Sequence, residues 1–132
     1  MKINRVLDTS ALMAVFRDEP GADKVAVSLL AGGCVMHVAN MSEFYSAVPR
    51  KSTGLFTPVE AMAWVDRNGI DGIDWMDRPF ALLAAEVRVA VPALSLGDGL
   101  AVALASVLDV PLLVAERAFK KAAGFATIEL LR

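Results

Sequence analysis

Residues 3–12 read Ile3-Asn4-Arg5-Val6-Leu7-Asp8-Thr9-Ser10-Ala11-Leu12. Val6 and Leu7 favour a short buried strand, and the apolar residues at 11–16 favour a helix. The stretch therefore predicts a strand that ends in the carboxylate of Asp8 just as a helix begins. Ligands of open α/β sheets bind at the carboxyl ends of the strands. Asp8 is accordingly the first candidate site residue.

Strands and helices alternate along the rest of the chain. Further strands are expected at residues 34–38, 70–75, 110–115 and 127–130, and helices at residues 22–30, 40–52, 58–67, 77–89 and 99–108. This alternation predicts an α/β fold with a parallel sheet and helices on both faces, in a single domain over residues 1–132. Right-handed crossovers then place every helix N-terminus at the carboxyl edge of the sheet.

The composition is that of a globular chain with a substantial core. Of 132 residues, 56% are hydrophobic and 21% are charged. The lone cysteine, Cys34, excludes an internal disulfide and fits a reducing cytoplasm. The longest charge-free run, residues 25–42, is broken by Gly32 and Gly33, and Asp8 interrupts any signal-peptide core, so we expect a cytoplasmic protein without a membrane segment. A net charge of −2 argues weakly against a protein that coats nucleic acid.

The predicted topology brings four carboxylates to the carboxyl edge of the sheet. These are Asp8, Glu43, Asp98 and Glu116. Each acid also has a structural explanation, because acids are common in the first turns of helices. Asn40 with Glu43, and Ser95 with Asp98, have the spacing of capping boxes, and Asp8 can cap the helix that follows it. The functional interpretation therefore rests on the four acids together.

Clustered carboxylates repel one another and destabilise an empty site, and a bound cation removes that penalty. Oxygen ligands without cysteine or histidine indicate Mg²⁺, with Mn²⁺ as a substitute, rather than zinc. Such ions take their remaining ligands from water and phosphate, and they can activate a water for phosphoryl displacement. Thr9 or Ser10 can hold a phosphate oxygen or a metal-bound water.

The four segments that carry the acids are Leu7-Asp8-Thr9-Ser10-Ala11-Leu12, Asn40-Met41-Ser42-Glu43, Leu94-Ser95-Leu96-Gly97-Asp98 and Ala115-Glu116-Arg117-Ala118-Phe119. In order and over the length of the chain they resemble the four acidic motifs of the PIN-domain nucleases. The resemblance is closest to the VapC-type toxins of bacterial toxin–antitoxin pairs. The fourth motif departs from the family, which usually has aspartate where Glu116 stands, so Glu116 is either a metal ligand or a group that supports one.

The resemblance implies a three-layer α/β/α domain with about five parallel strands. It also implies a Mg²⁺-dependent, single-strand-specific endoribonuclease that acts as a toxin on cellular RNA, such as tRNA or rRNA, and arrests growth. Its partners would be an antitoxin protein and a second copy of the chain. Carried over by position, the catalytic residues are Asp8, Glu43, Asp98 and Glu116, the metal ligands are Asp8 and Asp98, and Thr9, Ser10 and Arg117 give support.

Two alternatives stay open at this point. The first is a catalytically weak PIN-fold domain that binds RNA or a protein, which the departure at Glu116 allows. The second is a receiver-like signalling domain phosphorylated on Asp8, although that class carries an acidic pair at the first strand and only one acid is present.

Basic and apolar residues add expectations about partners. Arg50, Lys51, Arg117, Lys120 and Lys121 either line a phosphate track or are ordinary solvated residues. The apolar stripe on the helix that begins at Asn40 belongs either to the core or to a partner surface; its residues, with the loop that follows, are Met41, Phe44, Tyr45, Val48, Leu55 and Phe56. His37 is expected to pack rather than to bind metal.

Overall fold

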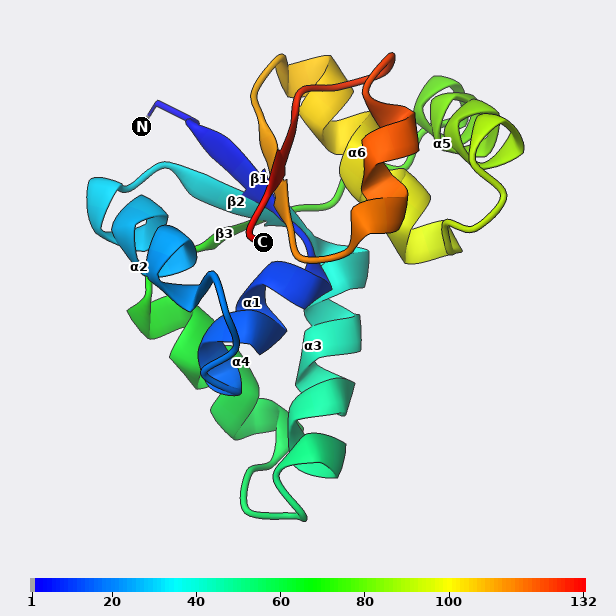
Figure 1. Ribbon diagram of the computed structural model, residues 1–132. Helices are drawn as coiled ribbons and strands as arrows, with labels where there is room; N and C mark the ends of the chain where they lie inside the picture. Colours follow the sequence, from blue (N-terminus) through cyan, green and yellow to red (C-terminus); the bar gives the residue numbers. More distant parts are fainter. Residues whose placement is uncertain (1) are drawn as a thin grey trace.

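A parallel sheet of five short strands lies at the centre of the molecule (Figure 1). The structure is a computed structural model that describes residues 2–132. The strands are β1 (Arg5–Leu7), β2 (Cys34–His37), β3 (Asp71–Ile73), β4 (Leu112–Val114) and β5 (Ile128–Leu130). Their order in the sheet is β3-β2-β1-β4-β5, and every pair of neighbours is parallel. The predicted parallel α/β fold is confirmed, and β1 is its central strand.

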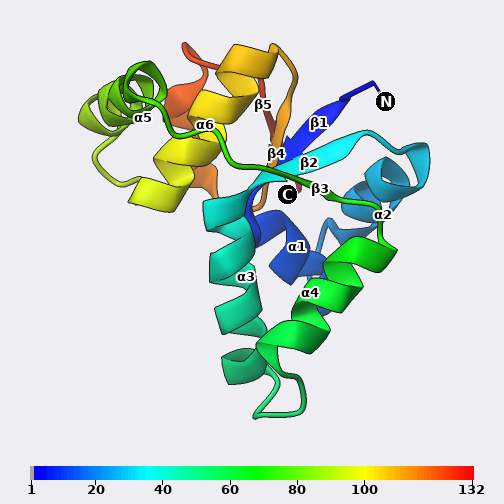
Figure 2. The same cartoon turned by 180° about the vertical axis from the view of Figure 1, so that it is seen from behind.

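Helices cover both faces of this sheet. They are α1 (Thr9–Phe16), α2 (Ala22–Ala31), α3 (Val38–Lys51), α4 (Pro58–Arg67), α5 (Arg78–Ala90), α6 (Leu96–Leu108) and the 3₁₀ helix η1 (Arg117–Ala122). Leu7 packs with α1, α2, α3 and α4 on one face, and its neighbour Val6 packs with α5, α6 and η1 on the other. Successive residues of a strand point to opposite faces, so Val6 and Leu7 are both apolar because both faces of β1 are covered at these positions. Figure 2 shows the same two groups of helices from behind.

The start of α3 differs from the prediction, and the difference matters for the site. The cap is His37, whose Nδ1 accepts a hydrogen bond from the Ala39 N–H at 3.1 Å, so the helix begins at Val38. Nε2 then carries the ring proton and donates to the Trp75 carbonyl at 2.8 Å. The predicted capping by Asn40 is therefore wrong. Asn40 lies inside the first turn, which leaves its amide available for other contacts.

The apolar stripe of α3 belongs to the core. Met41, Phe44 and Val48 are buried and Tyr45 is half-buried, so the stripe packs in the core, although Phe44 and Val48 also line an apolar cavity there. The loop after α3 differs, because Leu55 and Phe56 are exposed there. Among residues 2–132, no helix is both long enough and apolar enough to cross a membrane.

Candidate active site

A cleft of about 430 Å³ opens at the carboxyl edge of the sheet. Its lining residues are Asp8, Thr9, Ser10, Met13, Arg17, Glu19, Glu43, Ser95, Asp98, Ala115, Glu116 and Arg132. All four predicted acids are among them, although they come from the residue after β1, from α3, from α6 and from the segment after β4. Figures 1 and 2 show the first turns of α1 and α3 side by side at this edge. The topology thus brings the four carboxylates to one cleft.

Asp8 is the buried acid of the cleft, with 2% of its surface exposed. Its Oδ1 caps α1 by accepting from the Ala11 N–H at 3.0 Å, and it also accepts from the Ser10 hydroxyl at 2.7 Å. The Ser10 oxygen in turn accepts from the Ala115 N–H at 2.9 Å, just beyond β4. Ser10 therefore fixes Asp8 and joins the ends of β1 and β4, rather than pointing a free hydroxyl at a ligand.

Glu43 is held by a small polar network between α1, α3 and α6. Its Oε1 accepts from the Asn40 amide at 3.0 Å and lies 3.3 Å from the Thr9 hydroxyl, which donates over the shorter distance of 3.0 Å to the Asn40 carbonyl. The second amide hydrogen of Asn40 goes to the Gly97 carbonyl at 3.1 Å, so Asn40 links α3 to α6. Asn40 is buried and was not expected in the site. The only sequence signal for it is its position three residues before Glu43.

Asp98 combines a structural contact with its place in the cleft. Its Oδ2 accepts from the Ser95 N–H at 2.9 Å, and the Ser95 hydroxyl accepts from the Asp98 N–H at 3.2 Å, which completes the predicted capping box. Gly97 lies between these residues and has a separate function in packing. A Cβ on Gly97 would lie 2.8 Å from Cδ of Glu43, so only glycine lets the Glu43 carboxylate rest against α6.

Glu116 is exposed and stands two residues after β4, directly before η1, without a side-chain capping bond to that helix. Partial burial raises its pKa, and the negative charges of Asp98 and Glu43 raise it further.

Arg117 is exposed and does not line the cleft, so the structure does not bring it to the acids as predicted. The other candidates for a phosphate track, Arg50, Lys51, Lys120 and Lys121, do not line the cleft either, which favours the alternative of ordinary solvated residues. The cations of the cleft are Arg17 and Arg132.

Burial gives Asp8 an unusual protonation. It raises the Asp8 pKa from 3.8 to about 7, which outweighs the lowering by the hydrogen bonds from Ser10 and Ala11. The negative charges of Asp98 and Glu116 add to the rise. A carboxylate that is buried beside other acids destabilises the folded chain when it ionises, unless a cation is bound nearby.

The donor set suits a hard divalent cation. Every acidic side chain in the cleft offers oxygen, and neither histidine nor cysteine lines it. Within residues 2–132, no three histidine, cysteine, aspartate or glutamate side chains come close enough to hold one ion together. An oxygen-only donor set is the kind that Mg²⁺ or Mn²⁺ takes, because these ions bind few carboxylates and retain water ligands.

The PIN domain model matches residues 5–125 of the chain. The chain belongs to the PIN-domain family. PIN domains are generally nucleases and typically use divalent metal ions. The sequence matches no curated protein.

Solved structures with the same fold include chains of toxin–antitoxin complexes. A chain of a toxin–antitoxin complex from Klebsiella pneumoniae is 17% identical, with a TM-score of 0.71 and 98% of both chains covered. A chain of DNA-bound VapBC from Salmonella typhimurium is 12% identical, with a TM-score of 0.71, covering 98% of this chain and 99% of that one. A chain of VapBC2 from Rickettsia felis, bound to a promoter DNA fragment, is 12% identical with a TM-score of 0.71, covering 96% and 98%. At these identities the likeness establishes the PIN fold alone.

The raised pKa of Asp8 predicts a distinctive dependence of stability on pH. Between pH 3.8 and about 7 the folded state retains a proton that the unfolded state has released. Without divalent ions, the free energy of unfolding should therefore fall as the pH rises through this range, by up to about 4 kcal/mol from this group. Asp8→Asn should remove that fall and be the more stable protein above pH 7.

Urea unfolding in EDTA, followed by tryptophan fluorescence across this pH range, measures the effect. Asp74→Asn is the matched control, because Asp74 is an exposed acid outside the cleft. An identical pH dependence for Asp8→Asn and the unmodified chain would contradict the assignment.

Proposed function

We propose that this PIN domain is a Mg²⁺-dependent, single-strand-specific endoribonuclease that acts as the toxin of a toxin–antitoxin pair. The observation that carries the proposal is the cleft that the buried Asp8 shares with three further predicted acids from separate segments, Glu43, Asp98 and Glu116. Such a cluster costs stability in the absence of a cation, so its presence favours a catalytic function over a structural one. The likeness of the four acidic segments to VapC-type toxins supports RNA as the substrate.

The residues of the cleft have separate functions in the proposed hydrolysis. Asp8 and Asp98 would hold the divalent ion, which supplies charge neutralisation and lowers the pKa of a bound water. Ser10 and the Ala11 N–H keep Asp8 in one orientation. Glu43 has Oε1 fixed by Asn40, and its other oxygen is available to orient water or to accept a proton.

Glu116 fits a supporting position better than that of a direct ligand. It is exposed, stands two residues after β4, and its side chain, one methylene longer than aspartate, makes no capping bond to η1. Its charge nevertheless raises the pKa of Asp8, so it acts on the same site. We propose that Glu116 contributes to the negative potential that attracts the ion.

One observation favours a second candidate, a PIN domain that binds RNA but cleaves it poorly. No three acids of residues 2–132 converge closely enough to hold an ion together, and the fourth motif carries glutamate. The two candidates differ in whether bound RNA is cut when Mg²⁺ is present.

Substitution of single acids distinguishes them. Asp8→Asn and Asp98→Asn should abolish cleavage of single-stranded RNA, because each removes a proposed ligand of the ion. Glu116→Gln should lower the rate more mildly, by roughly 10-fold, as is usual for groups that support a metal ligand. Cleavage is followed on a labelled oligoribonucleotide with Mg²⁺, and EDTA should stop it.

Asp109→Asn is the control, since Asp109 is exposed at the end of α6 and does not line the cleft. Full cleavage in EDTA would exclude the metal mechanism. RNA binding without cleavage by the unmodified chain would favour the second candidate instead.

Gly97 offers a way to move Glu43 without replacing it. A Cβ at this position meets only the flexible carboxylate end of Glu43, so Gly97→Ala should fold normally and displace that carboxylate. Alanine is also the better helix residue by about 1 kcal/mol, which favours an unchanged or higher melting temperature. We expect the cleavage rate to fall roughly 10- to 100-fold, as for other small misplacements of catalytic groups. Undiminished cleavage by Gly97→Ala would show that the position of Glu43 is unimportant.

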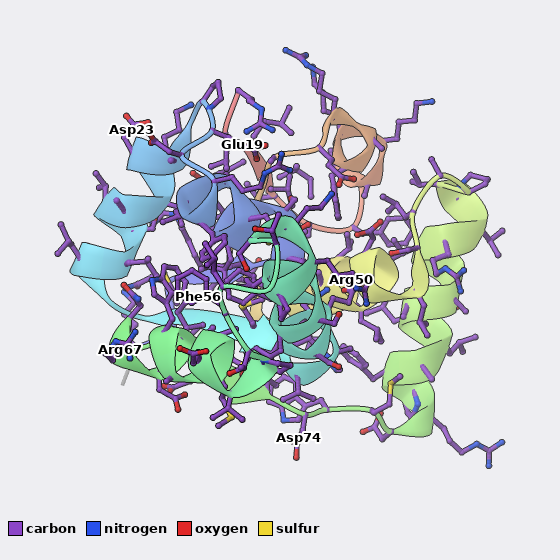
Figure 3. All side chains as sticks on the ribbon, turned by 90° about the horizontal axis from the view of Figure 1, so that it is seen from below. Glu19, Asp23, Arg50, Phe56, Arg67 and Asp74 are labelled. Atoms are coloured by element: carbon purple, nitrogen blue, oxygen red, sulfur yellow. The ribbon has the colours of Figure 1, made fainter. Side chains whose placement is uncertain are left out.

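An apolar cavity of about 130 Å³ between α1, α3 and α4 suits the antitoxin. Phe16, Phe44 and Trp64 form its floor, and the exposed Phe56 stands at its rim with its ring 5.3 Å from that of Phe16. Figure 3 shows Phe56 among these helices. Exposed apolar surface around a groove favours an amphipathic helix or an extended apolar segment. We propose that an antitoxin segment binds here and that the chain forms a homodimer.

Expression of the chain alone should arrest growth, and co-expression of the product of the neighbouring gene should restore it. Phe56→Glu should abolish co-purification of that product, because a charge then occupies the apolar rim. Leu30→Glu is the control, since Leu30 is 90% exposed and lies on α2 away from this cavity. Sedimentation of the free chain should give the mass of a dimer. If the chain is harmless alone while the purified protein cleaves RNA, the toxin assignment fails and the nuclease assignment survives.

A further inference from the structure

Two arginines and a fifth acid also line the cleft, and the proposed mechanism of RNA hydrolysis assigns them no function. Arg17 lies directly after α1, Arg132 is the last residue of the sequence, and Glu19 lies in the turn between α1 and α2. All three line the same cleft as the four acids. Arg17 and Arg132 are its cations among the residues that the structure describes.

Glu19 brings the two arginines together. Its Oε2 lies 3.8 Å from Nη1 of Arg17, and its Oε1 lies 3.8 Å from Nη2 of Arg132. Arg132 also donates from Nη1 to the Pro20 carbonyl at 2.8 Å. Figure 3 shows Glu19 beside the end of the chain. We name Arg17, Glu19 and Arg132 the arginine wall of the cleft.

The turn after α1 is shaped to receive the end of the chain. Gly21 has a φ of +92°, and a Cβ on it would lie 2.6 Å from both Cβ and O of Leu131. Leu131 is itself buried, and its N–H donates to the Val114 carbonyl at 2.9 Å. The absence of a side chain at Gly21 therefore allows the residues after β5 to pack on this turn, which places Arg132 at the cleft.

The three side chains of the arginine wall together carry a net positive charge, and the guanidinium groups retain free hydrogen-bond donors. One carboxylate faces two guanidinium groups, and both ion pairs are at the long distance of 3.8 Å. The Arg17 side chain is 49% exposed and that of Arg132 is 38% exposed. Each guanidinium has five N–H donors, so most of them remain available to a ligand.

The charged residues in the rest of the cleft are acidic, so the arginine wall is the part of the cleft that can attract a phosphate group directly. A phosphodiester that entered the cleft would be repelled by Asp8, Glu43, Asp98 and Glu116 unless cations met it. A divalent ion at Asp8 and Asp98 can attract the phosphate under attack, but it provides no positive charge for the phosphates on either side of it. Arginine binds phosphate through paired N–H groups in a planar fork, which suits this second requirement.

We propose that Arg17 and Arg132 bind a backbone phosphate of single-stranded RNA next to the one that is cleaved, and that Glu19 holds the two guanidinium groups in place for it. This inference rests on the proposed nuclease function and adds a positioning site to it. The lysines and arginines that the sequence suggested for a phosphate track, such as Lys120 and Lys121, lie outside the cleft.

A purely structural explanation makes different predictions. Arg132 fastens the end of the chain to Pro20 and Glu19, so its loss lowers stability under that explanation without affecting ligand binding. Arg17 has no such contact beyond its pair with Glu19. A phosphate contact instead changes both RNA affinity and the dependence of that affinity on salt.

The test measures binding of a short fluorescein-labelled single-stranded oligoribonucleotide by anisotropy over a range of salt concentrations, with Mg²⁺ present. The chain carries Asp8→Asn throughout so that the RNA stays intact. Arg17→Ala and Arg132→Ala should each weaken binding about 10-fold. Each should also reduce the slope of log K against log salt by about 0.7, the value for one single-strand phosphate contact.

Conservative variants and a matched control sharpen the result. Arg17→Lys and Arg132→Lys keep the charge and lose the planar fork, so they should retain the salt slope and bind more weakly than arginine. Arg78→Ala, at an exposed position on α5 outside the cleft, should change neither quantity. Melting temperatures recorded on the same samples separate binding from folding.

Unchanged affinity and salt slope in Arg17→Ala and Arg132→Ala, with RNA cleavage intact in the chain that retains Asp8, would overturn this inference alone. A lower melting temperature with an unchanged salt slope would overturn it in favour of the structural explanation. If the chain that retains Asp8 neither binds nor cleaves RNA, the proposed nuclease function fails, and this inference fails with it.

Discussion

The structure depends on the burial of one carboxylate at the end of its central strand. Asp8 directly follows the central strand β1, which helices cover on both faces. Its side chain therefore lines the cleft while it stays almost completely buried. Its hydrogen bonds with Ser10 and the Ala11 N–H tie the carboxylate to the start of α1. Because the ionised form is unfavourable there, the folded chain favours either a proton or a cation at this point.

The other acids of the cleft show how structural and chemical functions can share one side chain. Asp98 caps α6 with one carboxylate oxygen and still lines the cleft. Glu43 is held by Asn40 and rests against the bare backbone of Gly97. A capping contact therefore does not argue against a site, since its hydrogen bond offsets part of the side-chain entropy that is lost when the carboxylate is fixed.

The PIN fold is shared with chains that are only 12–17% identical over nearly the whole length. Such divergence is possible because buried strands require apolar residues of suitable size rather than particular ones. Val6 and Leu7 illustrate this, because each packs into a separate layer of helices. The ligands of a protein with this fold must then follow from its own cleft and exposed surfaces. In this chain these include the arginine wall and the cavity beside Phe56.

The sequence alone determined the alternation of strands and helices and the convergence of the four acids, because strand ends in a parallel sheet meet at one edge. It also located the capping box of Ser95 and Asp98, which is a local pattern. Only the tertiary structure decided that His37 rather than Asn40 caps α3, since that choice depends on the Trp75 carbonyl from another segment. It alone brought Arg132 to Arg17, because the packing of Leu131 on Gly21 joins distant parts of the chain and leaves no periodic signal in the sequence.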